Sequence, residues 1–340
     1  MIEVEQLSKI YGSTPAIADV TFKVEAGEIV GFLGPNGAGK TTTMRILTGY
    51  LPATSGHARI AGYDVHEDSM AVRQRIGYLP ETPPLYPDMT VEAFLFFVAR
   101  IKGVVAGDRA GAVNWAIKRC NLQEKRRVLI RKLSKGFRQR VGIAQAIVHD
   151  PPAIILDEPT VGLDPRQIIE VRNLIKSLAG SHTIILSTHI LPEVSMTCNR
   201  VTIINRGKVV ATNTPDGLMA QLAVGAGYEL EIDGDEDTAM ERLRNLPGVS
   251  LVERIPVSRG DRAVLRVVSS QGTEPGREIA AALVSAGLGL YEMRRTKASL
   301  EDVFLELTTT EKVATDELVA RTEVLSSGEG EGDRQQEGEG

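Results

Sequence analysis

The sequence predicts an α/β domain with a mixed, largely parallel sheet, followed by a smaller α+β domain and a disordered acidic tail. Three observations support this. Short apolar runs alternate with helical patterns over residues 1–222, a β-α-β-β-α-β order follows over 225–310, and apolar character is lost over 311–340. Alternating strands and helices are typical of a parallel sheet covered by helices. A segment of low hydrophobicity and high charge cannot offset the entropy cost of ordering.

In the first domain, four runs predict strands, at 27–34, 153–157, 182–188 and 200–207. The first three are nearly continuous in apolar residues, as expected of strands that helices bury on both faces. Apolar residues at helical spacing then predict helices over 42–51, 140–148 and 165–179.

The second domain has its own set of elements. Strands are predicted at 228–233, 251–258, 262–270 and 290–297, and helices at 237–248 and 276–289. Their order is that of a ferredoxin-like unit. One more helix is expected from Ser299, a residue suited to capping, with acidic residues in its first turn.

Composition and charge argue against several classes of function. The net charge is -5, but residues 311–340 hold nine acidic against three basic residues, so the rest is close to neutral. That leaves no electrostatic case for binding nucleic acid. No segment approaches the roughly 20 apolar residues of a spanning helix, and the N-terminus does not read as a signal peptide. The two cysteines lie far apart, which fits a reducing compartment.

The stretch "GPNGAGKTT" matches G-x-x-x-x-G-K-[ST] between a predicted strand and a predicted helix. In that motif the glycines let successive N–H groups turn toward phosphates. The lysine supplies a charge to the β and γ phosphates, and the next hydroxyl binds Mg²⁺. The candidate phosphate-binding residues are Gly34, Pro35, Asn36, Gly37, Ala38, Gly39, Lys40, Thr41 and Thr42.

Two carboxylates end the buried strand of "AIILDEP". Ligands bind outside the carboxyl ends of such strands, so Asp157 is predicted to hold Mg²⁺ together with Thr41. Glu158 is predicted to be the base that polarises water for attack on the γ-phosphate. The chain has no N-K-x-D motif, which a GTPase would need to read its base.

Further motifs occur in a fixed order: "LSKGFRQR" precedes "ILDEP", and "GLDP" and "STH" follow it. With the phosphate loop, these motifs resemble those of the nucleotide-binding subunits of ABC transporters, over residues 1–222. The resemblance implies a P-loop ABC ATPase domain with a helical subdomain, and ATP hydrolysis with Mg²⁺ that drives transport. It also implies a head-to-tail dimer of the chain with itself or a homologous subunit.

The resemblance also implies roles for individual residues. Tyr11 matches the aromatic residue that stacks on adenine. His189 matches the histidine that bonds the γ-phosphate and acts with Glu158 and Lys40 in catalysis. Ser134 and Gly136 match ligands of the γ-phosphate held by the partner subunit, and the interface aspartate of the dimer is matched by Asp164.

Two residues depart from the family pattern. Glu81 stands where the family usually has Gln, and we expect it to touch Mg²⁺ or its water, because a carboxylate suits that ion. Lys135 replaces a glycine of the common LSGGQ form. Its side chain either points to solvent or adds a cation beside the phosphate of the partner's ATP.

The segment "TKASLEDVFLELT" resembles the ending of ABC-2-type export subunits, and "GYLPE" with "LSKGFRQRVGIAQAI" is similar to the gliding-motility-associated and multidrug-efflux branch. This implies a separate membrane permease, contacted through residues 83–102, and a place on the cytoplasmic face of the plasma membrane. The apolar "AFLFFV" within that segment could equally be the core of a helix. The competing function is a soluble ABC ATPase acting on ribosomes or DNA. A ligand-sensing role for 225–310 is an alternative for that domain. The sequence does not indicate which substrate is transported.

Overall fold

The computed structural model describes residues 1–221, 227–259, 262–270, 272–296 and 304. The chain divides into two compact units, Met1–Leu218 and Met219–Gly340. The helix expected from Ser299 and the acidic tail expected at 311–340 lie outside the described residues.

A six-stranded sheet in the order β10-β9-β3-β8-β7-β6 forms the centre of the first unit. All neighbouring pairs are parallel except β9 with β10. Every residue of β3, β7 and β8 is buried, which agrees with the apolar runs that predicted them. The strands are β3 (Ile29–Leu33), β6 (Ile76–Leu79), β7 (Ala153–Asp157), β8 (Thr183–Thr188), β9 (Arg200–Asn205) and β10 (Lys208–Asn213).

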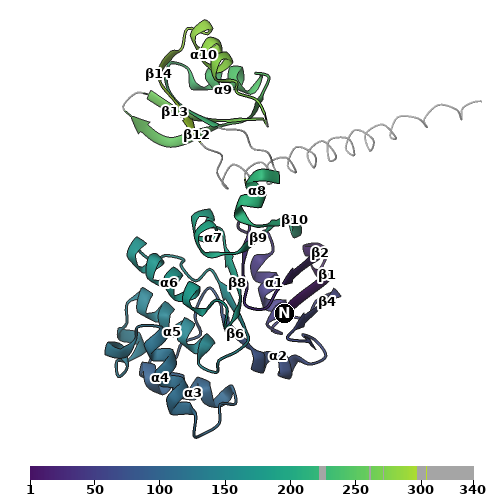
Figure 1. Ribbon diagram of the computed structural model, residues 1–340, viewed down its shortest axis with the longest axis vertical. Helices are drawn as coiled ribbons and strands as arrows, with labels where there is room; N and C mark the ends of the chain where they lie inside the picture. The colour runs from purple at the N-terminus through teal and green to yellow at the C-terminus, as the bar shows by residue number, and fades with distance from the viewer. Residues whose placement is uncertain (222–226, 260–261, 271, 297–303, 305–340) are drawn as a thin grey trace, which may run out of the picture. The chain divides into compact units, whose positions relative to one another are not determined.

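A second, antiparallel sheet has the order β2-β1-β4-β5 and was not anticipated from the sequence. It lies on one side of the central sheet in Figure 1, and its apolar residues share one core with α1 and the central strands. Its strands are β1 (Ile2–Tyr11), β2 (Thr14–Val24), β4 (Ser55–Ile60) and β5 (Tyr63–Asp64).

Three helices, α3, α4 and α5, pack together on the other side of the central sheet (Figure 1). Side-chain oxygens of Thr90, Ser134 and Asp164 accept backbone N–H groups and so begin α3, α5 and α6. The helices are α1 (Lys40–Leu47), α2 (Ser69–Arg75), α3 (Val91–Ile101), α4 (Arg109–Arg119), α5 (Lys135–Ile147), α6 (Pro165–Leu178), α7 (Leu191–Thr197) and α8 (Pro215–Gln221).

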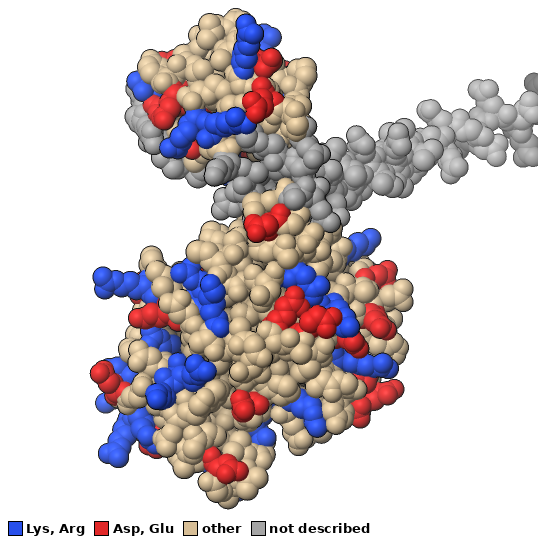
Figure 2. All heavy atoms as spheres, viewed as in Figure 1, with Lys and Arg blue, Asp and Glu red and all other residues tan. Residues whose placement is uncertain are grey.

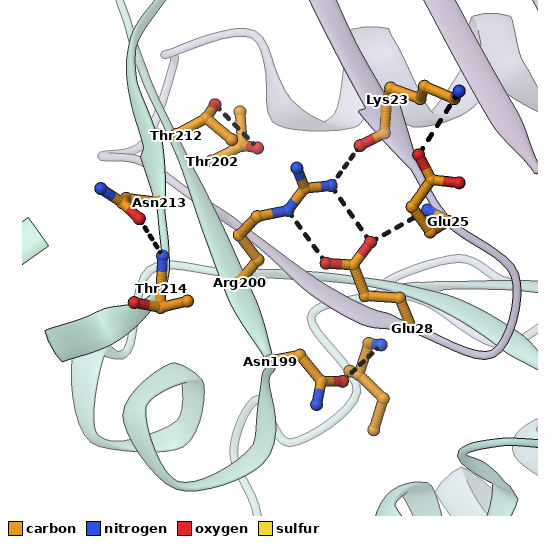
Figure 3. A network of polar contacts seen from close by, with 10 residues as sticks. Lys23, Glu25, Glu28, Asn199, Arg200, Thr202, Thr212, Asn213 and Thr214 are labelled. Atoms are coloured by element: carbon orange, nitrogen blue, oxygen red, sulfur yellow. Dashed lines mark hydrogen bonds and ion pairs between the residues drawn. The ribbon is translucent and has the colours of Figure 1, made fainter. Parts of the chain in front are cut away.

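A polar network fastens the ends of three strands at the edge opposite the phosphate loop (Figure 3). Arg200, at the start of β9, donates to both carboxylate oxygens of Glu28 at 2.9 and 3.1 Å. The same guanidinium donates to the carbonyl of Lys23 in β2. Asn199 accepts the N–H of Ile29 at 2.9 Å. Because a bidentate pair fixes direction as well as distance, β3 and β9 are held in register.

The surface of the first unit carries both signs of charge, with Lys and Arg side chains standing among Asp and Glu over the face in Figure 2. Among the helices of the described residues, none has the length and apolar content needed to cross a bilayer. The exposed large apolar residues of the first unit include Tyr86 at 53%, Phe97 at 38% and Ile101 at 63%. The rings of Tyr86 and Phe97 meet edge to face, 5.5 Å apart.

Helix α5 approaches the central sheet closely at Gly77 of β6, where an added Cβ would lie 2.0 Å from the carbonyl oxygen of Ala146. We expect Gly77→Ala to lower the free energy of unfolding by about 1–3 kcal/mol, because backbone on both sides would have to move. Gly111, in α4, has open space around it. Gly111→Ala should therefore raise stability, by up to about 1 kcal/mol. Denaturant unfolding compares the two, and equal stabilities would contradict this account of β6.

The second unit has the predicted β-α-β-β-α-β order, and its antiparallel sheet runs β12-β13-β11-β14. Apolar residues of β11 and β13 pack against α9 and α10 in a separate core. The ferredoxin-like prediction is confirmed. The elements are β11 (Gly227–Asp233), α9 (Glu236–Arg244), β12 (Val249–Arg259), β13 (Arg262–Ser269), α10 (Gly276–Ser285) and β14 (Gly289–Thr296).

Candidate active site

The phosphate loop joins the end of β3 to the start of α1. Two of its glycines are required by close contacts. A Cβ on Gly34 would lie 2.4 Å from the carbonyl oxygen of Ile204, and one on Gly39 would lie 2.5 Å from Cγ2 of Ile17. Gly39 also has φ of 105°, which side chains rarely allow. The loop therefore curls tightly against β9 and β2 and leaves its N–H groups at the start of α1, where an anion binds well.

Backbone carbonyl groups of this loop hold the side chain of Lys40 in place. Its ammonium donates to the carbonyl oxygens of Gly34 at 2.7 Å and Pro35 at 3.1 Å. It lies 3.7 Å from Oε1 of Glu158, and the side chain is 7% exposed. Burial lowers the pKa of Lys40, and the carboxylates of Glu158 and Asp157 oppose this. The result is a desolvated cation that is aimed at the loop.

Asp157, the last residue of β7, is fully buried, and burial raises its pKa. The hydroxyls of Ser187 and Thr41 lie near enough to favour its ionised form, but neither carboxylate oxygen completes a hydrogen bond of normal geometry with any described residue. Buried acceptors are nearly always satisfied. Two free carboxylate oxygens beside a hydroxyl are oxygen ligands of the kind that Mg²⁺ takes, so the residues fit that ion.

Glu158 and His189 meet because β7 and β8 pair with Asp157 opposite Ser187. Nδ1 of His189 lies 2.9 and 3.0 Å from the two carboxylate oxygens of Glu158. Glu158 has φ of 49°, in the left-handed region, and its N–H donates to the carbonyl of Ser187 at 2.9 Å. Such strain persists where the surroundings fix it, often at functional sites. The carboxylate is thereby presented to the phosphate loop.

Lys40, Glu158 and His189 open onto one cavity of about 570 Å³, whereas the fully buried Asp157 does not line it. Most of the predicted phosphate, base and metal residues are brought together there, including Glu81, which projects from the segment after β6. Ala16 and Val161 also line this cavity. They were not predicted, because a small apolar side chain has no charged or reactive group that marks it as a site residue. The lining residues are Ala16, Asn36, Gly37, Gly39, Lys40, Thr41, Thr42, Glu81, Glu158, Val161 and His189.

Tyr11 does not line this cavity. It lies at the end of β1, 48% exposed, with the ammonium of Lys9 5.5 Å from its ring centroid. Its ring is therefore open to a stacking partner, although the structure gives it no contact with the phosphate loop.

Ser134, Gly136 and Asp164 lie in a different cavity of about 330 Å³, between the starts of α5 and α6. Ser134 accepts the N–H of Phe137 at 3.4 Å, and Asp164 accepts that of Gln167 at 3.0 Å. A Cβ on Gly136 would lie 2.3 Å from Oε1 of Gln167, so glycine lets the two helix starts approach. Within one chain, these residues are not gathered around the phosphate loop.

Lys135 turns away from that second cavity. A Cβ on Gly162 would lie 2.0 Å from its Nζ, so the ammonium rests on the loop between β7 and α6. Lys135 and Glu81, the two departures from the family pattern, line one common cavity of about 680 Å³. No motif in the chain predicts that these two residues meet.

Comparison with known proteins identifies the family. The family model described as "ABC transporter" matches residues 17–161. The bacitracin transport ATP-binding protein of Bacillus licheniformis is 33% identical, and the match covers 90% of this chain and 97% of that protein. This chain belongs to the ABC transporter ATP-binding family. The resemblance that its motifs indicated is confirmed.

Other relatives of this ABC ATPase are also similar along most of its length. The Nod factor export ATP-binding protein I of Paraburkholderia xenovorans is 34% identical, over 90% of this chain and 96% of its own. The linearmycin resistance ATP-binding protein of Bacillus subtilis is 29% identical, with coverage of 91% and 98%. These alignments extend well beyond the first unit.

Solved structures confirm the predicted fold class. An ATP-binding subunit of an ABC transporter superposes with a TM-score of 0.60 and 33% identity, over 65% of this chain and 92% of its own. A bacterial ABC transporter cassette, MJ0796, described in its dimeric form, gives 0.58 at 25% identity, over 63% and 98%.

Proposed function

We propose that this chain is the ATP-binding and ATP-hydrolysing motor subunit of an export complex. The observation that carries the proposal is the convergence of Lys40, Glu158 and His189 on the phosphate-loop cavity. The buried carboxylate of Asp157 lies near enough to Lys40 to act on its charge. The relatives that match along almost the whole chain are named for bacitracin transport, Nod factor export and linearmycin resistance.

The chain's own residues divide the work of hydrolysis. N–H groups of the loop and the Lys40 ammonium bind the β and γ phosphates. Glu158 accepts a proton from the attacking water, and His189, bonded to Glu158, orders that water beside the γ-phosphate. Asp157, Thr41 and Glu81 would hold Mg²⁺, which supplies charge neutralisation at the phosphates when bound. Described residues offer no cluster of three or more His, Cys, Asp or Glu for a metal. Water and phosphate oxygens would supply the remaining ligands, as is usual for this ion.

A dimer completes each site. Ser134, Gly136 and Asp164 lie in a cavity of their own, so they serve a nucleotide only if a second copy or a homologous subunit brings its phosphate loop to them. The start of α5 offers free N–H groups there. The dimeric form of a related bacterial cassette supports this arrangement. Exposed Tyr11 would stack on the adenine.

Replacement of Lys135 tests the proposed dimer. Because its ammonium rests on Gly162 rather than in the cavity of Ser134, we expect Lys135→Gly to leave ATP-dependent dimerisation unchanged. The measurement is size-exclusion chromatography with ATP in a Glu158→Gln background, which slows turnover. Gly136→Gln, which fills the second cavity, is the matched variant and should block the dimer. A dimer weakened by Lys135→Gly would instead place that cation at the partner's phosphate.

Glu81 tests the metal site. We expect Glu81→Gln to keep ATPase activity but to raise the Mg²⁺ concentration needed for half-maximal rate, because a neutral amide attracts the ion less than a carboxylate does. The measurement is a Mg²⁺ titration of kcat. If both kcat and the Mg²⁺ requirement stay as in the wild type, Glu81 has no part in the metal site.

The exposed apolar group formed by Tyr86, which precedes α3, and by Phe97 and Ile101 of α3 is the proposed contact with a membrane permease on the cytoplasmic face. Tyr86, Phe97 and Ile101 are exposed in the first unit and follow Glu81 by 5, 16 and 20 positions in the chain. A cavity of about 410 Å³ lined by Tyr50, Tyr78 and Lys102, among others, borders the Glu81 segment through Pro80 and Pro84. Motion of the Glu81 segment on nucleotide binding would therefore reach the permease. An ABC-2-type permease is proposed from the exporter relatives.

Affinity purification of the full chain from detergent-solubilised membranes tests this function. We expect a multi-span membrane protein to co-purify, and Phe97→Glu with Ile101→Glu to abolish that association while basal ATPase activity persists. Met70→Glu, at an equally exposed apolar position on α2, is the control and should keep the partner. Recovery with ribosomes or DNA instead would overturn the transport function and favour a soluble ABC ATPase.

A further inference from the structure

Glu193 is a buried carboxyl group behind the Glu158–His189 pair, and the functions assigned above do not use it. It lies in the first turn of α7 and is 5% exposed. Thr188 donates its hydroxyl to Oε2 of Glu193 at 3.2 Å, and the same hydroxyl accepts the N–H of Ile190 at 3.1 Å. Thr188 and Ile190 flank His189 in the chain, so Glu193 fixes the backbone on which that histidine is carried.

The same carboxyl group borders the loop that carries Glu158. Thr160 follows Glu158 by two positions, is 4% exposed, and its hydroxyl lies close enough to Glu193 to favour the ionised form. Yet Oγ1 of Thr160 and Oε1 of Glu193 complete no hydrogen bond with any residue the structure describes. A buried donor and a buried acceptor left unpaired side by side cost free energy. A small shift of the loop toward α7 would form the hydrogen bond between Thr160 and Glu193 and remove this free energy cost.

The pKa of Glu193 also depends on charged groups of the active site. Burial raises its pKa, the hydroxyls of Thr160 and Thr188 lower it, Glu158 raises it and His189 lowers it. The pKa of Glu193 therefore depends on the charges of both Glu158 and His189, the candidate water-activating pair.

We propose that Glu193 is a positioning residue for hydrolysis, which sets the distance between His189 and Glu158 by bonding Thr188 on one side and Thr160 on the other. The inference rests on the catalytic assignment of Glu158 made above. The loop of Thr160 continues to Asp164, which faces the second subunit in the proposed dimer. Dimer formation would thus be transmitted to the catalytic pair by closure of the Thr160–Glu193 bond.

Steady-state hydrolysis by the full chain tests this. Glu193→Ala should lower kcat by roughly 10²-fold while KM for ATP is nearly unchanged, because a small misplacement of catalytic groups acts on the chemical step. Glu193→Gln should restore most of kcat, since an amide accepts from Thr188 and donates to Thr160. Thr160→Val should also lower kcat, and should add little to Glu193→Ala. Thr160→Val nearly preserves side-chain volume, so it serves even if Glu193→Ala fails to fold.

Thr197 supplies the matched control, because its buried hydroxyl on the same helix also lacks a partner among the described residues. Thr197→Val should keep the wild-type kcat. If Thr160→Val and Glu193→Ala keep it as well, while Glu158→Gln is inactive, the positioning function alone is overturned. If Glu158→Gln hydrolyses ATP at the wild-type rate, the catalytic assignment itself fails.

Discussion

Replacement of Glu158 by Gln is expected to reduce ATP hydrolysis by about 10²–10⁴-fold, the usual contribution of a general base. The amide has nearly the same shape and can still bond His189, whose Nδ1 lies 2.9 Å from Oε1 of Glu158. It cannot accept a proton from water. ATP affinity should therefore persist, and a dimer with bound nucleotide should accumulate. Single-turnover hydrolysis and equilibrium ATP binding, measured on the same preparation, separate the two properties.

Glu28 provides a control carboxylate for this experiment. It is paired with Arg200 at the opposite end of the central sheet and is 16% exposed. Glu28→Gln should lower stability, because it breaks the bidentate pair that joins β3 to β9, yet leave kcat unchanged. An equal fall in kcat for both variants would mean that Glu158 acts through stability and not as a base.

Replacement of Lys40 by Met is expected to lower kcat/KM for ATP by roughly 10²-fold or more, as removal of a donor to a developing phosphate charge does. The ammonium is already desolvated and held by two carbonyl oxygens, so it costs little to reorganise when phosphate binds. Methionine fills the same space without the charge. Both ATP affinity and turnover should fall, in contrast to Glu158→Gln.

Lys102 is the matched control, since it is a second largely buried lysine whose ammonium donates to two carbonyl oxygens, those of Arg73 at 2.8 Å and Ile76 at 3.1 Å. Burial lowers its pKa to about 8. It lies outside the phosphate-loop cavity. Lys102→Met should therefore affect stability and spare kcat/KM. If Lys40→Met also spared kcat/KM, the phosphate-binding function of the loop would be contradicted.

Much of this protein could be predicted from consecutive residues. The loop between Gly34 and Thr42 needs its glycines and its lysine in one short stretch, and the apolar runs of β3, β7 and β8 follow from burial on both faces. The antiparallel sheet of β1, β2, β4 and β5 escaped prediction because half-exposed strands with bulges lack a clean alternation. The cavity residues that were not predicted, such as Ala16, have apolar side chains that belong to no motif.

The sequence alone determined which chemical groups the protein has and in what order, because each motif is a local feature of the chain. Only the tertiary structure decided which of them meet. Glu158 and His189 come together because β7 and β8 pair with Asp157 opposite Ser187. Helix α7 then places the Glu193 carboxyl group behind both. Those contacts depend on strand register and helix packing, which are properties of the whole fold.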